Sequence, residues 1–152
     1  MSPQPGDICL FYNARGLARL ITWFTRSRYY HVALYDGDEH VIEARPRGVV
    51  RRNLQEAGEH YYIVIPAPKN SGERALQWAK EQLGDGYDVP GVLVLVLERL
   101  FDNLHLNYKP SHNRFSCGEL VLCAFRETGT NLLPEHSPDT VVPADFAQLI
   151  RK

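Results

Sequence analysis

Five short runs rich in β-branched and aromatic residues lie within the first 66 residues of the chain. Turn-forming residues such as Pro, Gly, Asn and Asp separate them, which is the pattern of short strands. We predict strands over residues 8–12, 30–35, 39–45, 48–54 and 60–66. Because the last four follow one another through turn residues, we expect them to form an antiparallel meander.

An amphipathic segment separates the first predicted strand from the second. Leu17, Leu20, Ile21 and Phe24 recur at helical spacing, and Asn13 is a candidate N-cap. We expect this apolar stripe to face a core and the arginines of the segment to face water. A basic amphipathic helix can also lie on a membrane surface, but this helix is short and its charges are few, which favours packing on a core.

The second half of the chain carries helical patterns. We predict helices from the Asn70-x-x-Glu73 capping box to Gly84, over 90–106, from Ser116 to Gly129 and over 143–150, with a loop at 109–113. Strands therefore come first and helices after. This order indicates an α+β fold, in which an antiparallel β-meander packs against helices, rather than a parallel α/β sheet.

Length and charge narrow the classes of protein to consider. A chain of 152 residues suits one domain with a real core, and we treat 1–152 as a single domain. Its net charge is −1, so no global field attracts nucleic acid or anionic membranes. The start of the chain lacks the pattern of a signal peptide, and the apolar run at 92–97 is too short to span a bilayer. We therefore expect a cytoplasmic protein with no nucleic-acid partner and no stable membrane insertion.

The cysteines differ in their local surroundings. Three cysteines without regular spacing do not make a disulfide framework, so free thiols are expected. Ser116 and Glu119 have the spacing of a capping box, which makes Cys117 the first helical residue. There the thiol meets unpaired backbone N–H groups and the positive end of the helix dipole, both of which favour a thiolate. Cys123 lies among apolar residues deeper in the same helix and is expected to be inert.

A cysteine nucleophile needs a base, and the base needs an orienting group. Among six histidines, His31 stands at the start of a predicted strand, and Glu43 lies in the next strand. If 36–38 forms a three-residue loop, Tyr35 pairs with Glu39 and His31 directly faces Glu43. Opposed residues share a face with Cβ atoms ~5 Å apart, which lets a carboxylate bind the imidazole N–H. Together with Cys117, these residues make a candidate Cys-His-acid triad.

Metal and nucleotide chemistry are less favoured by the sequence. The histidines and cysteines match no H-E-x-x-H or C-x-x-C pattern, so no metal site is predicted. The glycines between 84 and 91 fit neither a P-loop nor a dinucleotide fingerprint, and a helix stop followed by a turn explains them. We expect no cofactor.

Several motifs taken together resemble a known family. They are G-D-x-x-x-F-Y at 6–12, Y-H-V-A-L-Y at 30–35, V-I-E-A at 41–44, G-x-x-Y-D at 84–88, F-S-C-G-E-L-V at 115–121 and P-A-D-F at 143–146. The chain resembles the circularly permuted papain-like enzymes, specifically the YiiX-like branch of the NlpC-type peptidases, with the lecithin retinol acyltransferase-like enzymes as cousins. In that branch the histidine precedes the cysteine, as it does here.

The resemblance implies both a fold and a set of roles. The fold would be permuted papain-like, with Cys117 as nucleophile, His31 as general base and Glu43 as the residue that orients the base. Acyltransferase cousins often have a second histidine at the position of Glu43, so this residue favours the YiiX-like branch. Tyr29 is a candidate for the oxyanion or substrate-binding site, and Tyr12, Tyr30 and Ser116 are alternatives.

The expected activity is that of a thiol-dependent hydrolase. It would cleave an amide, ester or thioester bond of a peptide or acyl-lipid substrate through a Cys117 acyl-enzyme. An acyltransferase would use the same triad, and a non-catalytic binding module of the same fold is an alternative from another class. The apolar segment 92–106 could wall a cleft for an acyl chain, although an ordinary core helix also explains its composition.

Overall fold

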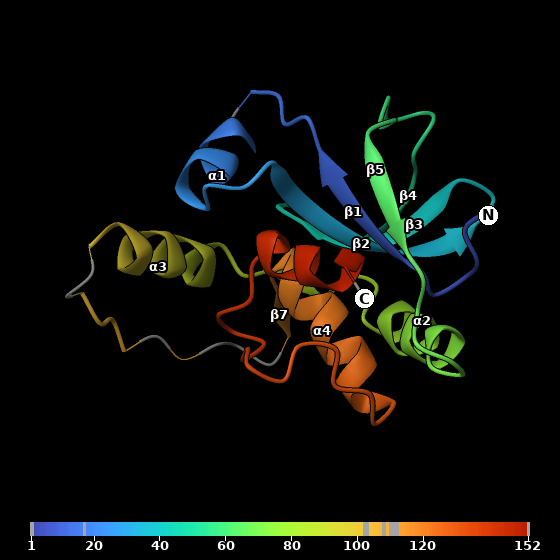
Figure 1. Ribbon diagram of the computed structural model, residues 1–152. Helices are drawn as coiled ribbons and strands as arrows, with labels where there is room; N and C mark the ends of the chain where they lie inside the picture. The colour runs from blue at the N-terminus through green and yellow to red at the C-terminus, as the bar shows by residue number, and fades with distance from the viewer. Residues whose placement is uncertain (1, 17, 102–103, 108, 110–112, 152) are drawn as a thin grey trace.

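An antiparallel sheet of five strands forms the centre of the protein (Figure 1). The computed structural model describes residues 2–16, 18–101, 104–107, 109 and 113–151. The strands are β1 (Ile8–Tyr12), β2 (Tyr29–Gly37), β3 (His40–Arg45), β4 (Gly48–Asn53) and β5 (Tyr62–Ile65). All five predicted strands are therefore confirmed, with small shifts at their ends.

The order of strands across the sheet is β4-β3-β2-β1-β5. The predicted meander is correct for β2, β3 and β4, but it is wrong for β5, which crosses the molecule and pairs with β1 through Ile8 and Ile65. Burial explains this placement, because Ile8 to Phe11 are fully buried and a buried strand needs backbone partners on both sides. Strand β1 therefore lies inside the sheet, between β2 and β5.

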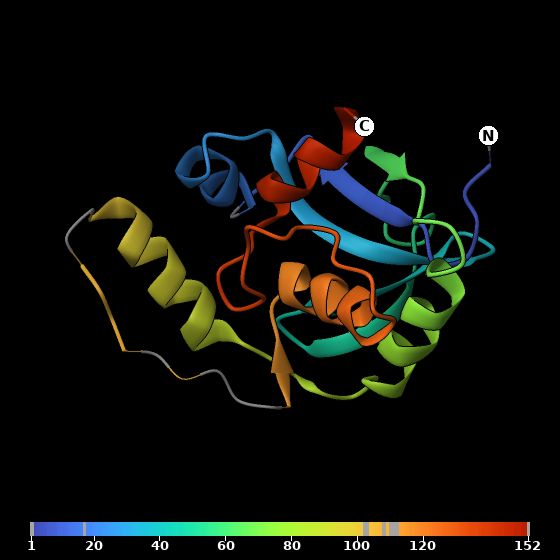
Figure 2. The ribbon, with the colours of Figure 1, turned by 60° about the horizontal axis from the view of Figure 1, so that its bottom comes forward.

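The helices surround this sheet (Figures 1 and 2). They are α1 (Ala18–Phe24), α2 (Gly72–Glu81), α3 (Val89–Leu100) and α4 (Cys117–Glu127), with a 3₁₀ segment η1 (Pro143–Arg151) near the end of the chain. Helices α2 and α4 pack on each other and on one face of the sheet, whereas α1 and α3 lie together at one side. The fold is a mixed one, with an antiparallel sheet and several helices, as the α+β prediction requires.

Alternating residues of the strands supply two apolar clusters. Val32, Leu34 and Ile42 belong to the larger cluster, which α2, α4 and η1 cover. Ala33 and Val41 project to the opposite face, into a smaller cluster around Phe11 and Cys9. This alternation is the two-residue period of a strand that is buried on both faces.

Three predicted helix ends are wrong by one or more residues. Asn13 does not cap α1, because its φ is +65° and the helix begins only at Ala18. Ser71, rather than Asn70, is the N-cap of α2. Helix α3 ends at Leu100 instead of 106, and the sequence that follows Phe101 is Asp-Asn, two residue types that compete with helical hydrogen bonding. The predicted loop at 109–113 lies largely outside the described residues.

A small two-stranded parallel sheet was not predicted from the sequence. It joins β6 (Gly86–Tyr87) to β7 (Arg114–Phe115), and Tyr87 pairs with Phe115. Each strand has only two residues, which is too short for a recognisable hydrophobic alternation. The pairing brings Tyr87 close to the start of α4, since Phe115 precedes Cys117 by two residues.

Leu20, one residue of the apolar stripe predicted for α1, is not buried. Leu20 is 52% exposed and Trp23 is 69% exposed, while Ile21 is partly buried. Leu17 lies outside the described residues. Among the helices that the structure describes, none is both long enough and apolar enough to cross a bilayer.

Candidate active site

The N-terminus of α4 holds the predicted nucleophile. The Ser116 hydroxyl accepts a hydrogen bond from the Glu119 backbone N–H at 3.2 Å, and the Glu119 carboxylate accepts one from the Ser116 N–H at 3.2 Å. This capping box was predicted, and Cys117 is the first helical residue. The thiol is therefore fixed at the positive end of the helix, where a thiolate is favoured.

A close backbone contact covers this helix end. A Cβ atom added to Gly118 would lie 2.9 Å from the carbonyl oxygen of Val141, so a larger residue would push the chain away. The absence of a side chain lets the segment before η1 approach Cys117 directly. Val141 and Val142 consequently line the same pocket as the thiol.

The predicted base and its orienting acid are also together. Nε2 of His31 lies 2.6 Å from Oε2 of Glu43, and both side chains are buried. Nε2 is occupied by Glu43. The other ring nitrogen of His31, Nδ1, therefore remains to face the sulfur. The imidazole lies close enough to the Cys117 sulfur for each group to shift the pKa of the other.

The hairpin that joins His31 to Glu43 differs from the predicted one. Asp38 and Glu39 have φ of +48° and +59°, the signature of a two-residue type I′ turn, and Gly37 pairs with His40. The loop is therefore not at 36–38, and Tyr35 pairs with Val41 rather than with Glu39.

The changed register does not separate His31 from Glu43. Leu34 pairs with Ile42, and extending this register by one residue sets position 43 across from Ala33 instead of His31. Predicted and observed registers differ by two residues, and side chains alternate with a period of two, so His31 and Glu43 remain on one face as diagonal neighbours. The prediction of direct opposition was wrong, but the prediction of a shared face was correct.

The backbone of β2 also contributes to the thiol's surroundings. Pairing between β2 and β3 begins at Leu34 and Ile42. The backbone N–H groups of Val32, just before that first pair, and of Gly118 act on the Cys117 sulfur and lower the pKa of the thiol. Hydrogen bonds from fixed N–H groups stabilise a thiolate more than a thiol.

These contacts favour an ion pair between Cys117 and His31. Burial raises the pKa of Cys117, but hydrogen bonds and the charge of His31 outweigh it, so the thiol pKa lies below its ordinary value of 9.0. Burial lowers the pKa of His31, but the Glu43 carboxylate and the Cys117 sulfur raise it to about 9. Both shifts favour a thiolate–imidazolium pair over a neutral thiol and imidazole.

Two arginines that were not singled out from the sequence hold Glu43. Nε of Arg45 lies 2.9 Å from Oε1 of Glu43, and Arg52 donates to both carboxylate oxygens, with its Nη2 3.2 Å from Oε2. Burial raises the pKa of Glu43, but His31 and the arginines bring it far below its usual range. Glu43 is fully buried and yet remains ionised.

An outer layer fixes the arginines in turn. The Glu59 carboxylate accepts from Nη2 of Arg45 at 3.2 Å and from the Tyr30 hydroxyl at 2.9 Å. Tyr30 also lines the pocket beside Cys117. A chain of hydrogen bonds therefore connects the pocket wall to Glu43.

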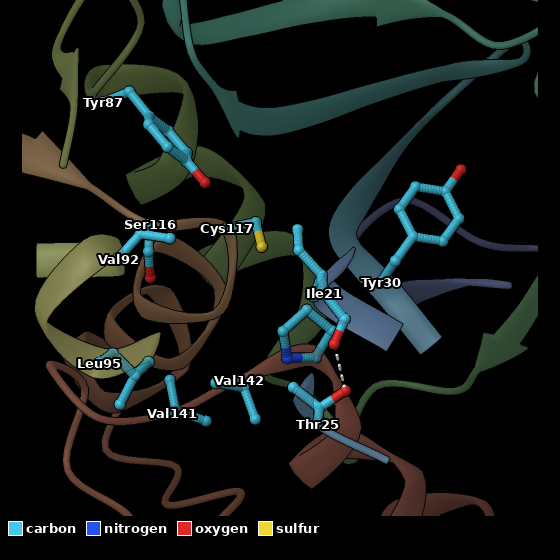
Figure 3. Close-up of a pocket in the computed structure, with 11 residues that line it drawn as sticks. Ile21, Thr25, Tyr30, Tyr87, Val92, Leu95, Ser116, Cys117, Val141 and Val142 are labelled. Atoms are coloured by element: carbon cyan, nitrogen blue, oxygen red, sulfur yellow. Dashed lines mark hydrogen bonds between the residues drawn. The ribbon is translucent and has the colours of Figure 1, made fainter. Parts of the chain in front are cut away.

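The pocket at the thiol is small and almost entirely apolar (Figure 3). Its volume is about 60 Å³. The apolar lining consists of Ile21, Val92, Leu95, Val141, Val142 and Pro143. The hydroxyl of Tyr87 points toward Cys117, whereas that of Tyr30 points away from it. Burial and the Cys117 sulfur both raise the pKa of Tyr87, so its hydroxyl remains protonated.

The tyrosines considered from the sequence are placed differently from Tyr87. The guanidinium of Arg28 lies over the rings of Tyr12 and Tyr29, 4.6 Å and 5.3 Å from their centres. Neither of these tyrosines lines the pocket at the thiol. Ser116 lines the pocket, but its hydroxyl caps α4. Tyr87 was not singled out from the sequence, and the G-x-x-Y-D motif that contains it was the signal that could have identified it.

Alkylation tests the thiol assignments. At neutral pH, iodoacetamide should modify Cys117 far faster than Cys9 or Cys123, because burial raises the pKa of these two thiols to about 12 and about 11. Peptide mapping after a short exposure measures the three rates. Faster modification of Cys9 or Cys123 would remove the basis for Cys117 as the nucleophile.

The cluster around Cys117 does not suit a metal ion. Among the described residues, no group of three or more His, Cys, Asp or Glu side chains is placed to hold one. Glu43 already receives hydrogen bonds from His31, Arg45 and Arg52, so its lone pairs are engaged and positively charged groups adjoin it. A cation there would displace these partners.

Comparison with known proteins bears on the fold. No protein-family model matches the chain. No curated protein matches it either. The crystal structure of the metalloprotein YiiX from Escherichia coli O157:H7 is similar, with a TM-score of 0.61 and 21% identity over 92% of this chain and 79% of that one. The likeness shows that this chain has a YiiX-like fold.

Proposed function

We propose that this protein is a permuted papain-like, NlpC-type cysteine hydrolase that forms an acyl-enzyme on Cys117. The observation that carries the proposal is the contact between the capped Cys117 thiol and His31, whose other ring nitrogen is held by the buried Glu43. The nucleophile adjoins the base and the base adjoins the orienting acid, which is the arrangement that a cysteine triad needs. The YiiX-like fold is consistent with this assignment.

The reaction follows from the protonation states. The Cys117 thiolate attacks a carbonyl carbon, and the bond to the leaving group breaks while the His31 imidazolium gives that group its proton. A thioester to Cys117 remains. His31, now neutral, removes a proton from water, the resulting hydroxide attacks the thioester, and the acid leaves with regeneration of the thiolate.

Two donors are available for the oxyanion. The backbone N–H of Cys117 belongs to the first turn of α4, where N–H groups lack helical partners. The Tyr87 hydroxyl points toward the thiol and stays protonated, so it can donate. We assign these two groups, rather than Tyr29 or Tyr12, to the oxyanion site.

The pocket lining favours an acyl group as the part of the substrate that enters. Aliphatic side chains from α1, α3 and the segment before η1 meet at the thiol, and they offer few hydrogen-bond partners for a peptide backbone. An amide, ester or thioester of an apolar acid fits this lining. An acyltransferase would use the same residues with an amine or alcohol in place of water.

Acyl-enzyme trapping tests the proposal. Intact protein is incubated with activated esters of short and medium fatty acids and with a peptide-based ester, and its mass is followed. We expect a fatty-acyl adduct on Cys117 that decays in water, no adduct in Cys117→Ala and an undiminished one in the matched Cys123→Ala variant. A folded wild-type protein that forms no adduct would favour the non-catalytic binding module.

A further inference from the structure

Helices α1 and α3 form one side of the molecule beside the pocket. They contact each other, and both extend away from the sheet on the same side in two views (Figures 1 and 2). Ile21 of α1 and Val92 and Leu95 of α3 line the pocket that contains Cys117 (Figure 3). The helix pair therefore forms part of the wall of the pocket that contains the thiol.

The outer surface of the pair is unusually apolar. Of the nine large apolar side chains that are exposed in the described part of the chain, five belong to these helices or to the residue that ends α3: Leu20, Trp23, Val89, Leu93 and Phe101. Their exposed fractions run from 52% to 69%. Leu20 and Trp23 are three residues apart and Val89 and Leu93 are four apart, so each pair lies on one helix face. Such a grouping beside a pocket marks an interaction surface.

Helix α1 and the residues that flank it are positively charged. Residues 13–28 contain four arginines and neither Asp nor Glu, although the whole chain has a net charge of −1. Arg15, Arg19, Arg26 and Arg28 are all exposed. We call these arginines and the five apolar residues the α1–α3 surface.

We propose that the α1–α3 surface docks on an anionic lipid bilayer, with the apolar side chains in the interface and the arginines against lipid headgroups. Three properties of the surface fit this partner: exposed aliphatic residues, a tryptophan, and arginines without acidic neighbours in sequence. Binding is peripheral, because neither helix is long enough to span a bilayer. The inference goes beyond the proposed reaction and does not depend on Cys117 being reactive.

Vesicle sedimentation tests the docking directly. The full chain is mixed with vesicles of phosphatidylcholine alone or with about half phosphatidylglycerol, and the bound fraction is measured. We expect binding to the anionic vesicles, weak binding to neutral ones, and a marked loss of binding as salt rises from about 0.1 M to about 0.5 M, because salt screens the arginines.

Paired variants locate the surface. Leu93→Glu should weaken binding about tenfold or more, whereas Leu83→Glu, at an exposed leucine beyond α2, should leave it unchanged. Arg19→Glu should weaken binding roughly tenfold, and Arg74→Glu, on the exposed face of α2, should not. Circular dichroism and thermal unfolding establish that each variant is folded.

The outcomes separate docking from chemistry and from other partners. Cys117→Ala should bind vesicles like the wild type, even if the acyl-enzyme proposal fails. Failure of the wild type to bind anionic vesicles, or equal loss with the surface and control variants, overturns the inference. So does a dimer in gel filtration that Leu93→Glu dissociates while vesicle binding is absent, since that result assigns the surface to a second copy of the chain.

Discussion

Replacing His31 by alanine is expected to slow acylation of Cys117 by about 10²-fold or more. The imidazole supplies a hydrogen bond and a positive charge to the sulfur, and these two effects outweigh the burial that otherwise raises the pKa of the thiol. Without them, Cys117 is a buried neutral thiol and a poor nucleophile at neutral pH. In the proposed mechanism, the same variant also lacks the proton donor for the leaving group.

The pH dependence of alkylation distinguishes a lost base from a damaged fold. In the wild type, the midpoint for alkylation of Cys117 should lie below 9.0, and in His31→Ala it should move above that value. His40→Ala is the matched control, because His40 lies on the neighbouring strand and Nδ1 of its ring bonds to the Asp38 carbonyl, at 2.7 Å. An unshifted midpoint in folded His31→Ala would mean that another group activates the thiol.

The parts of the site that depend on local sequence were predictable. The capping box lies within four consecutive residues, so its hydrogen bonds fix the position of Cys117 without reference to the rest of the fold. The shared face of His31 and Glu43 was also predictable, since a strand alternates with a period of two and an error of two residues in register leaves the face unchanged. The error arose because Asp38 and Glu39 both adopt positive φ, a conformation that Glu rarely takes.

Other parts depended on tertiary pairing. Arg52 pairs with Val41, and only the register between β3 and β4 places it beside Glu43. Arg45 had a local signal, because it follows Glu43 by two residues and so shares its face. Tyr87 is placed near the thiol by the pairing of two strands of two residues each. Strand β5 leaves the meander and pairs with β1. Periodicity carries no information on either arrangement.

Removing the charge of Glu43 is expected to lower both the pKa of His31 and the stability of the protein. In the wild type, the Glu43 carboxylate and the Cys117 sulfur raise the pKa of His31 to about 9 against the effect of burial, and Glu43→Gln keeps the shape and a hydrogen-bonding group without the carboxylate charge. NMR titration of the imidazole in a Cys117→Ala background isolates the contribution of Glu43. A His31 pKa that Glu43→Gln leaves unchanged in this background would contradict the proposed orienting role.

The effect on stability should be large and graded. Arg45, Arg52 and His31 all converge on Glu43, which is 0% exposed, so Glu43→Ala leaves positive charges close together without their partner. Breaking a buried ion pair from one side typically costs about 3–5 kcal/mol. Urea unfolding at pH 7 should show a loss of this size, while Glu59→Gln, at an outer-layer side chain that is 22% exposed, should cost less. Equal losses of stability for both variants would contradict the claim that Glu43 is the main stabilising residue of the cluster.

The sign of the pH dependence gives an independent check. The pKa of Glu43 is depressed in the folded protein, so the stability it provides is complete above its ordinary value of 4.5 and is lost as the pH falls below it. Glu43→Gln has no group to protonate at that position. Its free energy of unfolding should therefore fall less steeply than that of the wild type as the pH drops below 4.5. The two curves should therefore converge in acid. Curves that stay parallel throughout acid would show that Glu43 stabilises the fold by its shape rather than by its charge.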